Sequence, residues 1–303
     1  MPTESLIKFW PLIYSTLKEF WSITEPHIEE AAIRNGIPVE LYFYSELGLE
    51  YFSTEDFQKR DPFSNPEQFE KLFAQLFFKG WIEAPARDGR HQVTEKAREA
   101  ARQIIQAGDS HLATLEPLVN VNLRKMAILL KQVVTANNAA SVPPQKWAIL
   151  KRFRVADKDS GWLAQIREYL MDLFAYRDDS HLSASHPHFG RAGIVWSVLG
   201  SVWSGKAVTA QQMTESLAFR GYEVDDYKVA IQAAVEIEWL ESAEISGAFR
   251  PTPKGRELRA QAEGLTNEYF FRPWSVLKED ELDELYGHLA KLRDRLHELK
   301  KLH

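Results

Sequence analysis

Apolar side chains recur every three or four positions in several parts of the chain, the spacing that places them on one buried face of an α-helix. The clearest case lies just before Gly80. Its apolar positions are Phe69, Leu72, Phe73, Leu76 and Phe77. Asn65 is the predicted N-cap, Pro66 stands in the first turn, and Gly80 ends the helix. A shorter helix is predicted over 55–59.

A β-hairpin is predicted directly after this helix. Residues 81–83 form a first short strand, the Asp-Gly pair at 88–89 marks the turn, and 91–94 form the returning strand. A helix that runs over 95–105 follows, and an apolar segment over 39–49 predicts another helix before all of these. The order is therefore helix, helix, turn, helix, strand, turn, strand, helix.

The same order occurs a second time. Trp239-Leu240-Glu241 corresponds to Trp81-Ile82-Glu83 at a separation of 158 positions, and Thr252 corresponds to Thr94 at the same separation. Before the third helix the separation is 156, so a difference of two residues falls in a turn. This ordered series of matches predicts an internal repeat, and a repeat fixes the architecture of the chain.

The second copy has its own element boundaries. Its predicted helices cover 194–202, 210–219, 224–237 and 254–262. Thr209 caps the second of these helices, and Gly221 forms the turn before the third. Its hairpin strands are predicted over 239–241 and 249–252.

This order of elements resembles the winged helix-turn-helix fold, and MarR-like regulators in particular, over roughly 38–106 and 190–264. The shared ending, Trp-Ile/Leu-Glu followed by Thr-x-Lys-x-Arg-Glu, looks like the wing and the next helix of that family. The resemblance implies that the third helix enters the major groove of DNA while the wing follows the backbone. The predicted fold is mainly α with short β-hairpin wings: two winged-helix domains in tandem, each followed by helical arms.

The predicted domains follow from this architecture. They are an N-terminal helical arm over 1–37, a first winged-helix domain with its trailing helix over 38–140, a basic linker and helix over 141–188, and a second winged-helix domain with a heptad helix over 189–303.

Leucines repeat with heptad spacing near the C-terminus. They are Leu282, Leu285, Leu289, Leu292, Leu296 and Leu299. Such spacing predicts a seam that packs against another helix. In MarR-like proteins terminal helices form the dimer interface, so the resemblance implies either a homodimer through this helix or a single chain that mimics a dimer. The alternative is that the helix packs on its own domain.

Composition sets the class of protein. The 303 residues are 45% hydrophobic and 26% charged, which is typical of a globular chain, and there is no cysteine for disulfides or thiolate metal sites. Lys8 and Lys18 interrupt the apolar N-terminal run, so we expect no signal peptide and no membrane span, and a cytoplasmic location. The net charge of −6 counts against DNA binding unless positive charge is concentrated locally.

Candidate DNA-contacting residues lie on the third helices, the turns and the wings. They are Asn65, Gln68, Lys71, Arg87, Arg90, His91, Arg220, Lys228 and Arg250. Amides can contact base edges and cations attract phosphates. The alternative is that Asn65 is only a cap, Gln68 only helix surface, and the cations ordinary solvated charges. Asp225 and Asp226 make the third helix of the second copy acidic, which is unfavourable for DNA.

The chain has no nucleophile elbow, phosphate-binding glycine loop or dinucleotide fingerprint, so we expect neither an enzyme nor a cofactor. One cluster has metal-capable side chains, namely Asp178, His181, His186 and His188. Its spacing fits no zinc signature, and we interpret this segment as a polar interdomain loop rather than a metal site.

Aromatic side chains suggest a ligand. MarR-like proteins commonly bind small aromatic or lipophilic effectors, so the resemblance implies a pocket with Trp21, Tyr44 and Trp196 as candidate ligand-binding residues. The alternative is that these rings are core. The leading hypothesis is a transcriptional regulator that binds double-stranded DNA and responds to such an effector. The competing hypothesis is a winged-helix module that binds protein or a small molecule and not DNA.

Overall fold

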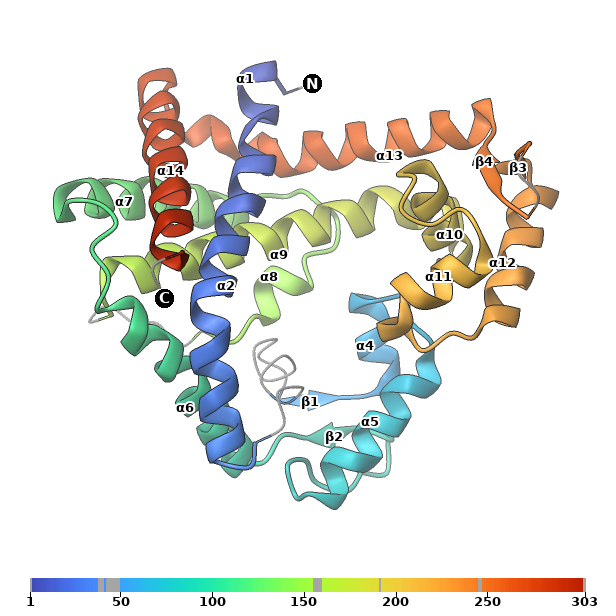
Figure 1. Cartoon of the computed structure of the whole chain (residues 1–303), viewed down its shortest axis with the longest axis horizontal. Coiled ribbons are helices and arrows are strands. Elements are labelled where there is room, and N and C mark those ends of the chain that lie inside the picture. Colours follow the sequence, from blue (N-terminus) through green and yellow to red (C-terminus); the bar gives the residue numbers. More distant parts are fainter. Residues whose placement is uncertain are drawn as a thin grey trace. The chain divides into compact units, whose positions relative to one another are not determined.

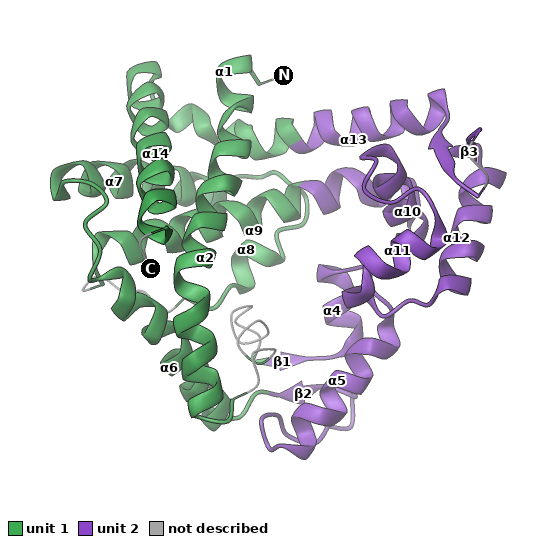
Figure 2. Ribbon diagram, viewed as in Figure 1, with its two compact units in different colours: residues 1–50, 93–180, 267–303 green, residues 51–92, 181–266 purple. Residues whose placement is uncertain are grey.

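The computed structural model describes residues 2–37, 41, 50–154, 160–190, 192–244 and 247–301. The chain forms two compact units, drawn in different colours in Figure 2. Unit 1 consists of residues 1–50, 93–180 and 267–303, and unit 2 of residues 51–92 and 181–266. Apart from Leu41, the segment predicted as a helix over 39–49 lies outside the described residues, and so does the candidate Tyr44.

Unit 1 is a helical assembly. Its helices are α1 (Glu4–Ile7), α2 (Phe9–Arg34), α6 (Glu95–Leu112), α7 (Asn120–Ala139), α8 (Ala148–Lys151), η2 (Arg272–Val276) and α14 (Glu279–Lys300). It also contains the first part of α9 (Trp162–Phe189) and the last part of α13 (Pro253–Phe271). Helix α2 packs along both α6 and α14 (Figure 1). One apolar core joins these helices.

The leucine seam of α14 is buried inside this core. Leu285, Leu289, Leu292 and Leu296 are each 0% exposed. Polar contacts hold α14 at its edges: His297 Nδ1 lies 3.1 Å from Glu19 Oε1 of α2. The seam therefore packs against helices of its own chain, and these leucines are not available to a second chain while this fold persists.

Charged side chains are also buried in unit 1. The carboxylate of Asp179 on α9 accepts hydrogen bonds from the main-chain nitrogens of Trp147, Ala148 and Ile149, at 3.0, 2.7 and 3.0 Å. Asp179 thus caps the N-terminus of α8, although it lies about 30 residues away in the sequence. Its negative charge stabilises the positive end of the helix dipole.

Unit 2 contains two sets of short helices and strands. The first set is β1 (Tyr51–Phe52), α4 (Thr54–Arg60), α5 (Pro66–Phe78) and β2 (His91–Gln92). The second is α10 (Gly193–Trp203), α11 (Ala210–Ser216), η1 (Ala218–Arg220), α12 (Val224–Glu236), β3 (Leu240–Ser242) and β4 (Phe249–Pro251). Helices α4 and α11 start 156 positions apart, whereas α5 and α12 start 158 positions apart.

Equivalent side chains cap the helices of the two sets. Ser53 Oγ accepts from the nitrogen of Asp56, and Thr209 Oγ1 accepts from the nitrogen of Gln212. The predicted cap at Asn65 is confirmed, because its Oδ1 accepts from the nitrogen of Glu67. The prediction of a mainly helical chain with small β elements is also confirmed, since the strands of the described residues form two antiparallel two-stranded sheets.

Two predicted elements were wrong. Residues 81–83 do not form a regular strand, although Ile82 makes a bridge and Glu83 N donates to the carbonyl oxygen of Gln92 at 2.9 Å, so the predicted hairpin closes. The regular partner of β2 is β1, with Phe52 opposite His91. The segment interpreted as an interdomain loop is helical, because Asp178, His181 and His186 all lie within α9. Tyr176, Ser180 and Ala184 are buried at spacings of four, so this stretch continues the buried face of the helix that begins at Trp162.

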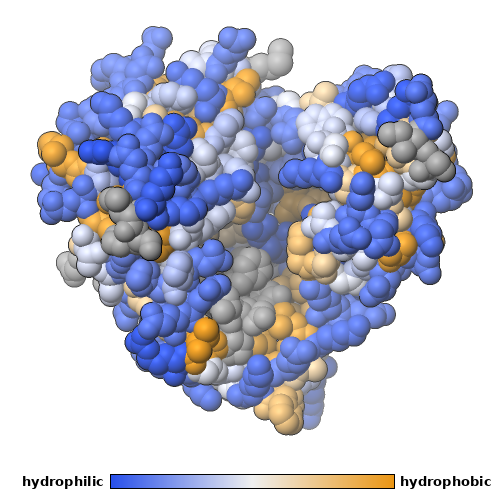
Figure 3. Space-filling view, in the orientation of Figure 1, coloured by the Kyte–Doolittle hydropathy of each residue, from blue (hydrophilic) through white to orange (hydrophobic). Residues whose placement is uncertain are grey.

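Within the described residues, no helix is both long enough and apolar enough to cross a membrane. Hydrophilic side chains cover most of the visible face of each unit, with scattered hydrophobic ones (Figure 3).

Candidate functional site

The start of α5 contacts the turn that precedes α12. The main-chain nitrogen of Asn65 donates to the carbonyl oxygen of Arg220 at 2.9 Å, and its Nδ2 donates to that of Gly221 at 3.1 Å. Gln68 Nε2 donates to the carbonyl oxygen of Phe219 at 2.6 Å. Both amides proposed to contact bases are therefore occupied inside unit 2, and base contacts would have to displace these bonds.

Glycines permit the close approach of the two sets of helices. Gly221 has φ of +68°, a backbone conformation that favours glycine, and a Cβ there would lie 2.5 Å from Gln68 Oε1. At Gly193, the first residue of α10, a Cβ would lie 1.9 Å from the carbonyl oxygen of Pro62. A side chain at Gly193 would push the chain at Pro62 away.

The exposed faces of the third helices differ in charge. Lys71 on α5 is exposed and forms a loose pair with Glu67, at 3.9 Å. On α12, Lys228 is paired with Asp225 at 2.8 Å, which leaves the exposed Asp226 and Glu236 in excess. Phosphate attraction supplies most of the sequence-independent affinity for DNA. The face of α12 is thus unfavourable for DNA, and that of α5 is close to neutral.

The wing regions carry the other cations. Arg87 is exposed near the tip of the first hairpin, while Arg90 donates to the carbonyl oxygen of Tyr51 at 3.3 Å. His91 Nδ1 lies 3.0 Å from the carbonyl oxygen of Glu83, which ties the hairpin together. In the second wing Arg250 Nε pairs with Glu241 at 2.9 Å. Arg87 is therefore the candidate cation most available to a phosphate.

Arg220 makes its contacts within unit 2. Its Nη1 donates to Ser197 Oγ at 2.9 Å, and its guanidinium lies 5.1 Å from the ring centroid of Phe63. Burial lowers the pKa of Arg220 from its usual range, and the more distant Asp61 partly offsets this. The side chain of Arg220 lines a cavity.

This cavity in unit 2 has a volume of about 340 Å³. Trp196, the candidate ligand residue, lines it together with Trp203, Arg220 and Arg259. Trp196 is only 2% exposed, and its ring stacks on His188 with centroids 5.5 Å apart. Trp196 is thus a core residue that also borders this cavity.

Trp21 has a different environment. It is partly buried in unit 1, where its ring packs edge-on against Tyr14 and Phe174. Trp21 therefore belongs to unit 1 and Trp196 to unit 2.

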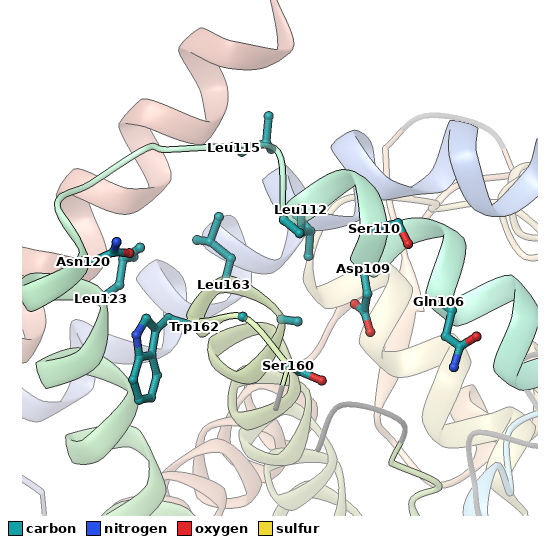
Figure 4. Close-up of a pocket in the computed structure, with 13 residues that line it drawn as sticks. Gln106, Asp109, Ser110, Leu112, Leu115, Asn120, Leu123, Ser160, Trp162 and Leu163 are labelled. Atoms are coloured by element: carbon teal, nitrogen blue, oxygen red, sulfur yellow. The ribbon is translucent and has the colours of Figure 1, made fainter. Parts of the chain in front are cut away.

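Unit 1 has a larger cavity of about 680 Å³, shown in Figure 4. Figure 4 places Asp109 on α6 and Trp162 at the start of α9 around it. Burial raises the pKa of Asp109, and the guanidinium of Arg167, at 2.8 Å, opposes that rise. The acidic group of this cavity is therefore already matched by a cation.

The histidines of α9 are separated by their contacts. His181 Nδ1 lies 3.7 Å from Glu263 Oε1, whereas the ring of His186 packs against Phe189. No group of three or more metal-ligating side chains is found in the described part of the chain.

Sequence analysis missed Arg259. It lies on α13 in register with the buried residues Gly255, Ala262 and Thr266, at spacings of four, three and four. A cation on the buried face of a helix is rare unless it has a partner. The place of Arg259 on the apolar face of the predicted helix was the feature that could have identified it from the sequence.

Residues 175–302 match a helix-turn-helix family. The match includes α11, η1 and α12, the helix, turn and third helix of the second set. It supports a helix-turn-helix protein and points to DNA binding in general terms. Comparisons with curated proteins and with solved structures find no match.

Proposed function

We propose that this protein is a DNA-binding transcriptional regulator with two winged helices in tandem, under the control of a small ligand. The observation that carries this proposal is the helix-turn-helix match over 175–302, on a segment where α11 and α12 are followed by the β3–β4 hairpin. The proposal gives the chain no catalytic role.

The first set of helices supports a duplicated architecture. Helix α5 has 13 residues, as α12 has, and Thr94 and Thr252 cap the helices that follow the two hairpins. We infer that an ancestral dimer of winged helices became a single chain. The burial of the α14 seam within the chain supports this inference over a homodimer through the same helix.

In the proposed complex the first set makes the main DNA contact. Arg87 and Arg90 lie on its hairpin, and Lys71 and Lys79 on or just after α5. The acidic α12 contributes little, because Asp226 and Glu236 repel phosphates.

Fluorescence anisotropy with a pool of random duplexes at low salt tests the proposal. We expect binding that strengthens as the salt concentration falls and that exceeds binding by an unrelated protein of equal negative charge. Equal binding by the two proteins would refute DNA binding.

The acidic face of α12 favours a second candidate, a winged-helix module that binds a protein or a small molecule and not DNA. The anisotropy experiment separates the two candidates, because this module would bind no better than the acidic control protein.

A further inference from the structure

The cavity of unit 2 has a strongly one-sided charge. Three cationic side chains line it, Lys206, Arg220 and Arg259, and no aspartate or glutamate is among its lining residues. Ser197 and Ser201 add hydroxyl groups, and Trp196 and Trp203 add flat apolar walls. Such a lining attracts an anion that also has an apolar part.

Arg220 has no close anionic partner among the residues that the structure describes. None of the described carboxylates forms an ion pair with it, and Asp61 acts only from a longer distance. Its Nε is buried and finds no hydrogen-bond acceptor among the described residues. Its contacts are the neutral hydroxyl of Ser197 and the rings of Phe63 and Phe219. A partly desolvated guanidinium without a close counter-charge is unfavourable, and an anion in the cavity would offset that cost.

Arg259 is 8% exposed and lies over two indole rings, 4.9 Å from the centroid of Trp196 and 5.3 Å from that of Trp203. Its ion pair with Glu263 is long, at 3.5 Å. Its Nε and the Nε1 of Trp196 are both buried without an acceptor in the described part of the chain. This site thus has unused donors as well as unbalanced positive charge.

We propose that this cavity binds a small carboxylate with a flat apolar body. The guanidinium groups of Arg220 and Arg259 hold the carboxylate, because the planar fork of arginine matches its two oxygens. Trp196 and Trp203 cover the flat body. A volume of about 340 Å³ accommodates a body of one or two rings.

The site adjoins the contact that holds α5. The carbonyl oxygen of Arg220 accepts the bond from Asn65, while its guanidinium lines the cavity. The inference rests on the ligand control of the proposed function, and it names the chemistry of that ligand. Ligand binding is measured without DNA, so a failure here would leave the DNA-binding test unaffected.

The test is titration of the full chain with benzoate at low salt, followed by ligand-observed NMR and calorimetry. Benzyl alcohol has the same ring without the charge, and inorganic phosphate has the charge without the ring. We expect saturable binding of one benzoate per chain, with each of the other two probes at least tenfold weaker. Benzyl alcohol or phosphate that binds as tightly as benzoate would overturn the proposal, as would the absence of saturable benzoate binding.

Variants locate the site. R220Q and R259Q are each expected to weaken benzoate binding at least tenfold. Lys206→Gln, at an exposed position, is expected to weaken binding a few-fold without affecting the fold, while the matched exposed change Lys228→Gln leaves binding unchanged. Circular dichroism identifies any arginine variant that does not fold. If K206Q and every folded arginine variant bind benzoate as the wild type does, the anion is not held in this cavity.

Discussion

The side-chain amide of Asn65 donates a hydrogen bond to the carbonyl oxygen of Gly221, and its Oδ1 caps α5 at the same time. One side chain thus starts a helix and joins it to the turn before α12. The neighbouring Gln68 makes a parallel bond to Phe219. These bonds stabilise the present arrangement of unit 2 and keep both amides away from any base edge.

Gly221→Ala is expected to lower the free energy of unfolding by about 2 kcal/mol. The left-handed backbone costs a residue with a Cβ roughly 1 kcal/mol, and displacement of Gln68 adds to this. Urea denaturation measures the change. Gly205→Ala is the matched control, because Gly205 also has positive φ, +70°, but open space around it. Equal losses in the two variants would show that the contact with Gln68 contributes nothing.

Asp179→Ala is expected to destabilise the chain by about 3 kcal/mol, because three main-chain N–H groups at the start of α8 would lose a buried charged acceptor. Chemical denaturation gives the value. Asp283→Ala, at an exposed position on α14, should change the unfolding free energy by no more than about 0.5 kcal/mol. A similar small effect for Asp179→Ala would contradict the capping role.

Arg152 and Arg154 contact the same carboxylate, Asp172, each at 2.8 Å, but their side chains are 3% and 40% exposed. We expect Arg152→Gln to cost about 3 kcal/mol, because it leaves buried carboxylates short of a partner. Arg154→Gln should cost about 1 kcal/mol or less, since water screens that pair. Thermal and urea denaturation of the two variants compare their losses of unfolding free energy. A larger loss for Arg154→Gln than for Arg152→Gln would show that burial does not determine the strength of these ion pairs.

The double change of Arg87 and Arg90 to glutamine is expected to weaken DNA binding for all sequences alike. Each lost phosphate contact should reduce the slope of log affinity against log salt by about 1. Anisotropy at a series of salt concentrations measures this slope. Arg250→Gln should have a smaller effect, because Arg250 is already neutralised by Glu241. A larger effect of Arg250→Gln would place the DNA contact on the second set of helices.

Local signals predicted many of the elements correctly. Thr209 and Asn65 cap helices as expected, since a cap depends on residues within one turn of each other. The change in separation from 156 to 158 also falls between α4 and α5, where the turn was expected. In contrast, the regular strand predicted over 81–83 was wrong: Glu83 does pair with Gln92 across the hairpin, but the ladder of β2 forms with Tyr51–Phe52, a partner that no local signal indicates.

The candidate site was harder to predict. Trp196 was identified from its aromatic character, but Arg259 and Lys206 were not, because their role depends on the residues that surround them in space. Arg220 was assigned to DNA on charge alone, whereas the fold places it beside Ser197 and Phe63.

The sequence by itself determined the helices α4, α5, α10, α11 and α12, the caps at Asn65 and Thr209 and the order of these elements, because hydrophobic periodicity and capping act over a few residues. Tertiary structure decided what those elements contact: the α14 seam is buried by helices of its own chain, and Asn65 meets Gly221. Contacts between residues more than 150 positions apart depend on how surfaces fit together. No short-range pattern in the sequence encodes that fit.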